Sequence, residues 1–391
     1  MGTANMPVRP SVMTCRERML AAMQAEPVDH VPCVPVCNPL HERQRVGHRY
    51  QFPWGPSERE RCEYLVDHLG VDTFCVVDIP AVNPAPGVSS RVWLEGDLIH
   101  KVWDTPCGKL SASVRYDERW VHGLDVPLYS DFLVGHCVKH WVESEQDLES
   151  LKTILRPPED GPALAKVRFD FMEARRLAEL FRLPVMAVIG KGLTGGLQLI
   201  GPTEICLMTL EQPDLVRAYL QWEHDLNLKL LDIAADLGVD IVRRNGFYES
   251  ADFYAPAMLK DFLGEFLRRE SQRAREGGMV STYTLNTGLM PILDHMAALE
   301  FDCFDSIDIA FNDFDLKRLV ESQPEGRSYL IGPSSVYHLW QDDPEPARAA
   351  VRRCFEVIGK RGLLISPCPS IHSIMPWNNM LAIIDEWRDL R

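Results

Sequence analysis

Short apolar segments alternate with longer amphipathic segments along most of the chain. The amphipathic segments have helical periodicity, as at residues 213–237, 256–275 and 344–361. The apolar segments have the composition of buried strands. Their centres lie near residues 33, 75, 187, 241, 282, 305, 330 and 364. Eight strand–helix units predict a parallel sheet closed into a (β/α)8 TIM barrel, with a doubly wound sheet as the alternative.

Residues 88–142 interrupt this alternation. The stretch D-L-I-H-K-V-W-D-T-P-C-G-K-L alternates polar and apolar positions around a turn, which is typical of an antiparallel hairpin. We therefore predict a β-rich insertion over 88–142, within a single barrel domain that spans 13–391. Residues 1–12 lack the apolar core of a signal peptide, and we interpret them as a disordered leader.

Several helix starts can be predicted from capping residues. Ser57 and Glu60 have the spacing of a capping box, which predicts a helix over 57–69. Thr14 and Ser144 stand where N-caps are expected. These signals fix local structure and carry no information about function.

Composition excludes some classes of protein. The net charge of −15 over 391 residues, without a basic run, argues against nucleic-acid binding. The longest apolar runs fall well short of the roughly 18 residues that a membrane helix needs. The eleven cysteines are scattered and form no C-x-x-C motif, which indicates free thiols in a reducing, cytoplasmic compartment.

In a barrel, active sites form where the carboxyl ends of the strands meet. The stretch G-G-M-V-S-T-Y-T-L-N-T-G-L-M-P-I-L, residues 277–293, is such a strand end followed by a polar turn and a helix start. A barrel would place several polar side chains around the same mouth. They are Asn38, Asp78, Lys191, Asn245, Glu249, Thr284, Asn286, Asp308, Ser334 and Ser366.

Most of these candidates also have a structural interpretation. Asp78 is either a turn cap or a functional acid, and Glu249 is a general acid, a metal ligand or a helix cap. Cys368 and His372 can bind zinc if further ligands come from elsewhere in the chain. The sequence G-K-G-L-T-G-G at 190–196 lacks the spacing of a Walker loop, and we expect a flexible loop there. The polar stretch 38–50 is either part of the mouth or a solvated basic loop.

The chain resembles the uroporphyrinogen decarboxylase superfamily, and within it the corrinoid-linked methyltransferase branch. The order and spacing of several segments carry this resemblance over nearly the whole chain. They are T-C-R-E-R-M-L-A-A-M-Q-A-E-P-V-D-H-V-P, G-V-D-T-F-C-V-V-D, A-P-A-M-L-K-D-F, E-P-A-R-A-A-V-R-R-C-F-E-V-I-G-K-R-G-L-L-I-S-P and M-P-W-N-N-M-L-A-I-I. The resemblance implies a (β/α)8 barrel, a site at the carboxyl ends of the strands, and a homodimer.

The chain departs from the zinc-dependent members of this branch. The resemblance implies His-x-Cys at the end of the strand near 282 and a further Cys after the last strand. Thr284 and Asn286 stand at the first two positions, and Cys368 or Pro369 at the third. Neutral Thr and Asn side chains cannot replace imidazole and thiolate as zinc ligands. A different metal set drawn from Glu249, Cys368 and His372 remains an alternative.

The chain also departs from the decarboxylases themselves. Asp78 matches the aspartate that holds pyrrole N–H groups in that family. The Arg-rich first loop has only a loose counterpart in Arg43, Arg45 and Arg49, and the late histidine falls on Pro369. The resemblance therefore favours methyl transfer over tetrapyrrole decarboxylation.

We predict a methyltransferase that moves a methyl group from a small donor, such as a methoxylated aromatic, to a corrinoid carried by a partner protein. An acid or a metal must assist the leaving oxygen or nitrogen. Asp78, Glu249 and His372 are the candidate catalytic residues. The candidate substrate-binding residues are Asn38, Phe247, Tyr248, Tyr283, Thr284, Asn286 and Trp377. The alternatives are a uroporphyrinogen-type decarboxylase and a non-catalytic ligand-binding barrel.

Overall fold

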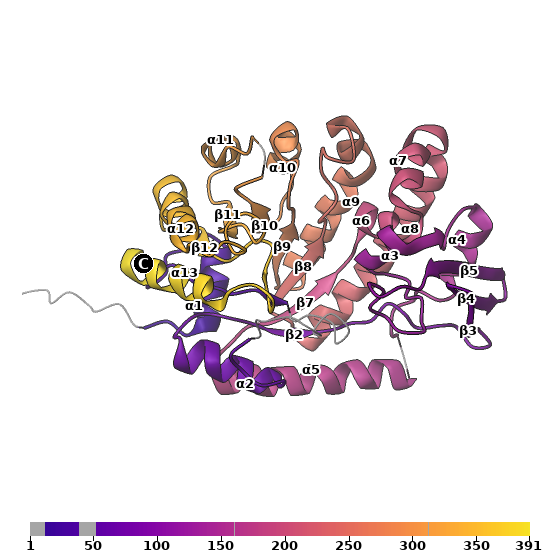
Figure 1. Cartoon of the computed structure of the whole chain (residues 1–391), viewed down its shortest axis with the longest axis horizontal. Coiled ribbons are helices and arrows are strands. Elements are labelled where there is room, and N and C mark those ends of the chain that lie inside the picture. Colours follow the sequence, from indigo (N-terminus) through magenta and orange to yellow (C-terminus); the bar gives the residue numbers. More distant parts are fainter. Residues whose placement is uncertain (1–11, 39–51, 160, 312) are drawn as a thin grey trace, which may run out of the picture.

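Seven parallel strands form the central sheet in the computed structural model, which describes residues 12–38, 52–159, 161–311 and 313–391. The strand order is β12-β11-β10-β9-β8-β7-β2 (Figure 1). The bounds are β2 Cys75–Val77, β7 Val185–Ile189, β8 Ile241–Asn245, β9 Val280–Thr284, β10 Cys303–Asp308, β11 Ser328–Gly332 and β12 Leu363–Ile365.

The segment around Cys33 closes this sheet into a barrel. The Val34 N–H donates to the Ile365 carbonyl of β12 at 2.7 Å, and the Asp72 N–H donates to the Cys33 carbonyl at 2.8 Å. The segment therefore lies between the two edge strands and occupies the eighth strand position. The predicted eight-unit barrel is confirmed, and the doubly wound alternative is wrong.

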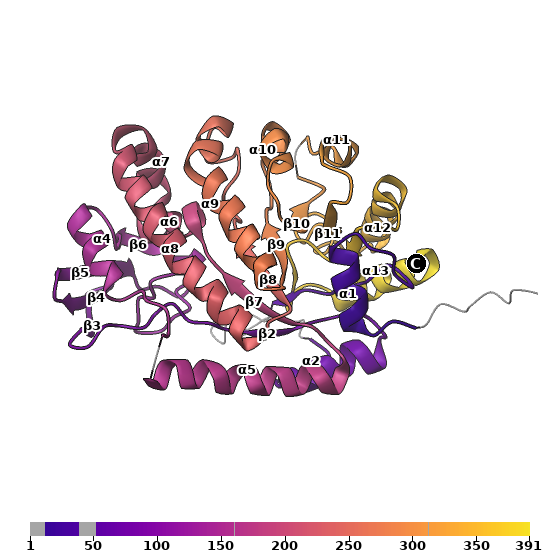
Figure 2. The ribbon, with the colours of Figure 1, turned by 180° about the vertical axis from the view of Figure 1, so that it is seen from behind.

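Helices cover the outside of the barrel (Figures 1 and 2). On the side shown in Figure 2, α8, α9 and α10 lie next to one another. The helices are α1 Cys15–Met23, α2 Glu58–Cys62, α3 Asp131–His136, α4 Glu145–Lys152, α5 Gly161–Phe181, α6 Gly192–Leu199, α7 Pro202–Glu211, α8 Pro213–Leu237, α9 Pro256–Glu276, α10 Leu293–Ala297, α11 Leu316–Ser322, α12 Glu345–Ile358 and α13 Trp377–Leu390. A π-helix, η2 Glu63–His68, continues α2, and a 3-10 turn, η3 Met290–Ile292, precedes α10.

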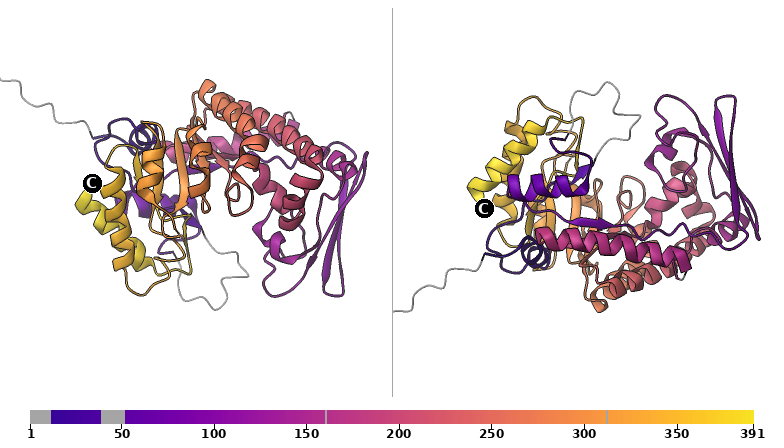
Figure 3. Two further views of the ribbon diagram at one scale, coloured as in Figure 1. Left: turned by 90° about the horizontal axis from the view of Figure 1, so that it is seen from above. Right: turned by 90° about the horizontal axis from the view of Figure 1, so that it is seen from below.

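A second, antiparallel sheet lies at one end of the molecule, away from α12 and α13 (Figures 1 and 3). Its order is β3-β4-β5-β6, with β3 Ser89–Glu95, β4 Leu98–Thr105, β5 Gly108–Arg115 and β6 Cys137–Lys139. All four strands come from the stretch expected to be β-rich. A two-stranded pair, β1 Cys37–Asn38 with β13 Ile371–His372, completes the strands among the described residues.

The predicted helix caps are confirmed, whereas the prediction for the glycine-rich segment 190–196 is wrong. Ser57 and Thr14 form the expected caps, each in a full capping box, and Ser144 caps α4. The flexible loop expected at 190–196 was wrong, because residues 192–199 form the buried helix α6. The glycines Gly192, Gly195 and Gly196 let this helix pack closely against neighbouring side chains. In the sequence alone, the same glycines indicate a flexible loop. Residues 1–11 of the leader expected over 1–12, and residues 39–50 of the polar stretch 38–50, lie outside the described residues.

Strand register decides which side chains face the barrel axis. Val188, Arg243 and Thr282 are lateral neighbours in β7, β8 and β9, so their side chains share one face. Arg244 and Tyr283 are lateral neighbours on the opposite face, which packs against the helices. Two consecutive arginines of β8 therefore point in opposite directions.

No helix in the described part of the chain is long and apolar enough to cross a membrane.

Candidate functional site

The inner face of the barrel is reachable from solvent at the carboxyl ends of β2 and β7. Val76 of β2 is 52% exposed and Val188 of β7 is 40% exposed, although both belong to strands of the central sheet. Asp78 follows β2 on the same face as Val76 and is also exposed. A packed barrel core would bury such valines. The interior on this side is therefore open to a small ligand.

An ion pair lies at the base of this opening. Arg243 of β8 approaches the Asp305 carboxylate of β10, with 3.2 Å between Nε and Oδ2, and Asp305 is fully buried. The guanidinium carbon lies 5.8 Å from the centre of the Phe74 ring, which precedes β2 on the other side of β7. Arg243 therefore spans the interior between β10 and the entrance to β2.

Three hydroxyl groups donate hydrogen bonds to the two oxygens of the Asp305 carboxylate. Thr282 donates to Oδ2 at 2.5 Å, and Thr284 and Ser306 donate to Oδ1 at 3.0 and 2.8 Å. These donors fix the carboxylate and stabilise its charge. Asp305 therefore serves as a rigid counter-ion for Arg243.

Thr284 and Asn286 stand where the resemblance implies two zinc ligands. In the structure, both side chains instead donate hydrogen bonds to neighbouring protein groups. Thr284 donates its hydroxyl to Asp305, and Asn286 donates Nδ2–H to the Ser306 carbonyl at 2.7 Å. Neither offers a thiolate or imidazole, so the residues at this strand end do not fit zinc. The fixed positive charge near this strand end comes from the Arg243 guanidinium.

Arg243 keeps two donor atoms without a partner. Nε and Nη2 are buried, and neither makes a hydrogen bond to the protein. The 3.2 Å approach of Nε to Asp305 is close enough for an ion pair, but its direction is wrong for a hydrogen bond. Buried polar groups without partners are rare in native proteins, and each one calls for an explanation. Nε already faces the Asp305 carboxylate, so Nη2 is the donor left for a further acceptor. A hydrogen bond from a guanidinium N–H to a carboxylate is charge-assisted and strong.

Arg244, the next residue, shows that the fold can satisfy a buried guanidinium. Its Nε donates to Glu270 of α9 at 2.9 Å, and Nη1 donates to the Asn245 carbonyl at 2.6 Å. Its Nη2 lies 3.4 Å from Oε1 of Glu249. The unfilled donors of Arg243 are therefore specific to the inner face.

Glu249 is buried on the outer face, within the network around Arg244. Its Oε1 accepts from the Leu193 N–H at 2.8 Å, and its Oε2 accepts from the Tyr283 hydroxyl. Burial raises the pKa of the Glu249 carboxyl. Both oxygens are thus occupied by protein groups, and Tyr283 is only 1% exposed. Their roles as acid and substrate donor stay predictions, and their contacts are those of residues that hold the β7–α6 turn.

This turn carries Lys191 at the end of β7. The Lys191 N–H donates to Glu223 at 2.7 Å, and the Tyr219 hydroxyl donates to the Gly192 carbonyl at 3.0 Å. The ammonium lies 5.2 Å from the centre of the Tyr129 ring. Burial lowers the pKa of Lys191, opposed by the charges of Asp131 and Glu223. Lys191 is therefore a half-buried cation whose pKa lies below that of an ordinary lysine.

The aromatic candidates Phe247 and Tyr248 lie in the segment that follows β8. Their rings meet edge to face at 5.1 Å, and the Tyr248 N–H donates to Thr194 of α6. The Tyr248 hydroxyl hydrogen-bonds to Asp131, which the inserted segment supplies. Both rings are half-buried. The insertion thus contributes to the wall next to Lys191.

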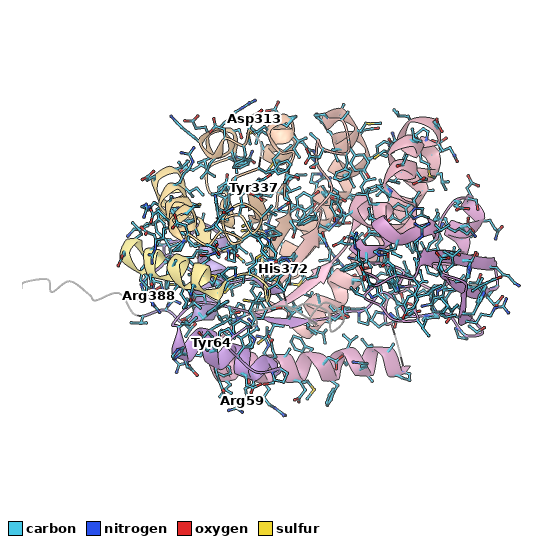
Figure 4. The ribbon with its side chains drawn as sticks, viewed as in Figure 1. Arg59, Tyr64, Asp313, Tyr337, His372 and Arg388 are labelled. Atoms are coloured by element: carbon cyan, nitrogen blue, oxygen red, sulfur yellow. The ribbon has the colours of Figure 1, made fainter. Side chains whose placement is uncertain are left out.

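A second group of candidates meets where β1 pairs with β13. Asn38 donates to the Ser370 hydroxyl at 2.9 Å, and His372 Nε2 lies 3.5 Å from the same oxygen. Burial lowers the pKa of His372. His372 lies toward the middle of the molecule, in contrast to Arg59 and Arg388 at its rim (Figure 4). Trp377 instead packs against Trp54, with 5.3 Å between ring centres.

The proposed metal set of Glu249, Cys368 and His372 is not brought together. Cys368 is buried, and its thiol points at the Ser366 carbonyl at 3.4 Å. Across the described ranges, one group of three His, Cys, Asp or Glu side chains has all its ligand atoms within 4.8 Å of one another. That group is Glu58, Cys62 and Cys75.

Sequence reasoning did not single out Arg243 and Asp305. Both residues lie inside strands, whereas the sequence-based prediction considered polar residues at the ends of strands. A charged residue within an otherwise apolar strand, as in I-V-R-R-N and C-F-D-S-I-D, is the signal that could have found them. Lys191 was placed at the mouth but given no role.

The family profile for uroporphyrinogen decarboxylase (URO-D) matches residues 135–390, well over half of the chain. The chain belongs to the uroporphyrinogen decarboxylase family. A search among curated proteins found no match.

Solved structures with the same fold include a methyltransferase from Methanosarcina mazei. It is 16% identical, with a TM-score of 0.60, and the match covers 96% of this chain and 99% of that one. A B12-independent methionine synthase from Shewanella sp. W3-18-1, in complex with selenomethionine, is 9% identical with a TM-score of 0.48, covering 92% and 96%. At 16% identity the likeness to the methyltransferase describes the fold alone.

Replacing Gly192 by Ala tests whether the buried network holds the β7–α6 turn. Gly192 has a φ of +46°, and an added Cβ would lie 2.3 Å from Arg244 Nη2 and from Glu249 Oε1. We expect G192A to lower the free energy of unfolding by about 3 kcal/mol or more, because a buried ion pair must open. The control is G238A, where φ is +80° and no atom lies within 4 Å, and we expect a loss of about 1 kcal/mol. Equal losses in urea unfolding would contradict a close-packed turn.

Proposed function

We propose that this protein is a methyltransferase that moves a methyl group from a small methoxylated donor to a corrinoid carried by a partner protein. We further propose that the donor bears a carboxylate, which pairs with Arg243. The observation that carries the proposal is the buried Nη2 donor of Arg243, which has no hydrogen-bond partner and lies on the same sheet face as the exposed Val188. The family membership and the likeness to a solved methyltransferase support the choice of chemistry.

The reaction sets a requirement at the leaving oxygen. A cobalt(I) corrinoid would supply the electron pair that accepts the methyl group, and the donor oxygen would keep the electron pair of the broken bond. An alkoxide or phenolate leaves poorly at neutral pH, so a proton must reach that oxygen. Lys191 suits this task because its ammonium is half-buried and its pKa is lowered. We propose Lys191 as the acid that protonates the leaving group.

The other candidates take supporting roles in this proposal. Glu249 acts as a positioning residue, because it accepts the Leu193 N–H just after Lys191. Asp78, which follows β2 next to β7, and His372 of β13 remain candidates for contact with the donor. Asn286 and Thr284 hold the counter-ion of Arg243 and its strand end in place. A fixed cation and a fixed acid on neighbouring strands would orient the methyl group toward the open mouth.

The proposed partner is a corrinoid protein. Cobalt must reach the methyl group in line, so a corrinoid protein would dock over the carboxyl ends of the strands. A homodimer is expected from the family resemblance. Neither association has a contact among the described residues, and both remain proposals.

Methyl transfer can be followed directly. The enzyme is incubated with a reduced corrinoid protein and a panel of methoxylated aromatics, each with and without a carboxylate. We expect methyl-cobalt absorption with the carboxylated donors, and a loss of about 10-fold or more in kcat/KM in R243Q, because one charge-assisted hydrogen bond is worth about 1.5–3 kcal/mol. R217Q, at the exposed Arg217–Asp261 pair, is the matched control.

Absence of methyl-cobalt with every donor, methylamines included, would contradict the proposed function. Carbon dioxide release from a porphyrinogen would instead support the decarboxylase alternative.

The pH dependence tests the role of Lys191. The ammonium can donate a proton below its pKa, so kcat/KM should fall as pH rises through that pKa. Because burial lowers the pKa from 10.5, the fall should begin at a lower pH than an ordinary lysine would give. We expect K191M to lose about 10²–10⁴-fold in rate, and K191R to move the alkaline limb upward. K229M, at an exposed lysine on α8, is the control. An unchanged limb in K191R would refute the assignment.

A further inference from the structure

Glu58, Cys62 and Cys75 form a cluster outside the barrel mouth that the proposed reaction does not use. Glu58 and Cys62 are one helical turn apart on α2, so both side chains lie on the same face. Cys75 comes from the outward face of β2, where it and Val77 are buried while Val76 faces the axis. The carboxylate oxygen and the two sulfur atoms lie within 4.8 Å of one another.

We propose that this cluster is a zinc site with two thiolate ligands and one carboxylate ligand. Thiolate and carboxylate are both ordinary zinc ligands, and tetrahedral coordination leaves one position for water. The two thiols are buried, whereas the side chain of Glu58 is 48% exposed. The carboxylate therefore stands at the solvent side of the site, where an ion would enter.

Arg61 orients the carboxylate as an outer partner. Its Nε donates to Glu58 Oε2 at 2.8 Å and its Nη2 to Oε1 at 2.5 Å. Its other contacts, the Thr73 hydroxyl at 2.7 Å and the Phe74 carbonyl at 2.8 Å, tie it to the segment before β2. Such partners fix the direction of a ligand in metal sites.

Charge balance favours a divalent cation. Two thiolates and one carboxylate carry three negative charges, and Arg61 supplies one positive charge. An ion of charge +2 brings the sum to zero, which suits a site with two fully buried ligands.

The backbone is irregular at this point in a way that accompanies functional sites. Helix α2 ends at Cys62, and the chain continues as the π-helix η2. Short π-helical segments occur often at functional sites. With an ion bound, α2 would be joined to β2 directly.

Metal titration tests the proposal independently of methyl transfer. The reduced, metal-free full-length protein is titrated with Cd²⁺ as a probe and with Zn²⁺ in competition. We expect one Cd²⁺ per chain with a thiolate-to-metal charge-transfer band, displaced by Zn²⁺, and a higher Tm in the bound form. C62S and C75S should lose the band, and E58Q should bind about 10-fold more weakly or worse.

Two matched variants keep the result interpretable. C107S changes a half-buried cysteine in the inserted sheet, and E63Q changes the exposed carboxylate that follows Cys62. Both should bind Cd²⁺ like the wild type. E58Q alters an exposed side chain and should fold even where a cysteine variant does not. No band in the wild type, or a band that survives in both C62S and C75S, would overturn the site.

Discussion

The burial of two consecutive guanidinium groups on β8 is the constraint on which the site depends. The pleat sends Arg243 to the barrel interior and Arg244 to the layer beneath the helices. A buried cation is costly unless ionic and hydrogen-bonding partners surround it. Arg244 has Glu270, Glu249 and a carbonyl. Arg243 has one carboxylate and two unfilled donors, so the same strand provides both the support and the binding group.

The two networks connect through the turn after β7. Glu249 and Glu223 hold the backbone on either side of Gly192, so Lys191 leaves the strand in a fixed direction. Asp305, with Thr282, Thr284 and Ser306, holds Arg243 from the opposite strand. A strand end that would carry zinc ligands in related methyltransferases therefore carries donors to a carboxylate. In our account, the Arg243 guanidinium orients the methyl donor in place of a zinc ion.

The sequence was sufficient for the barrel but not for the centre of the site. Eight apolar segments with helices between them predict the fold because each segment must be buried on both faces. Capping boxes at Thr14 and Ser57 follow from contacts three residues apart. Arg243 and Asp305 are more than 60 residues apart, and their pairing depends on the register of β8, β9 and β10. Nor can spacing alone reveal that Glu249 points outward, since its partners come from three other elements.

The central claim is that Arg243 binds a carboxylate on the donor. Calorimetric titration of the wild type and R243Q with a methoxybenzoate and the matching methoxybenzamide tests it without a corrinoid partner. Our account predicts that the wild type binds the carboxylate about 10-fold or more tightly than the amide, and that R243Q removes this preference. Equal affinity of the wild type for both ligands, or a preference that survives in R243Q, would contradict it.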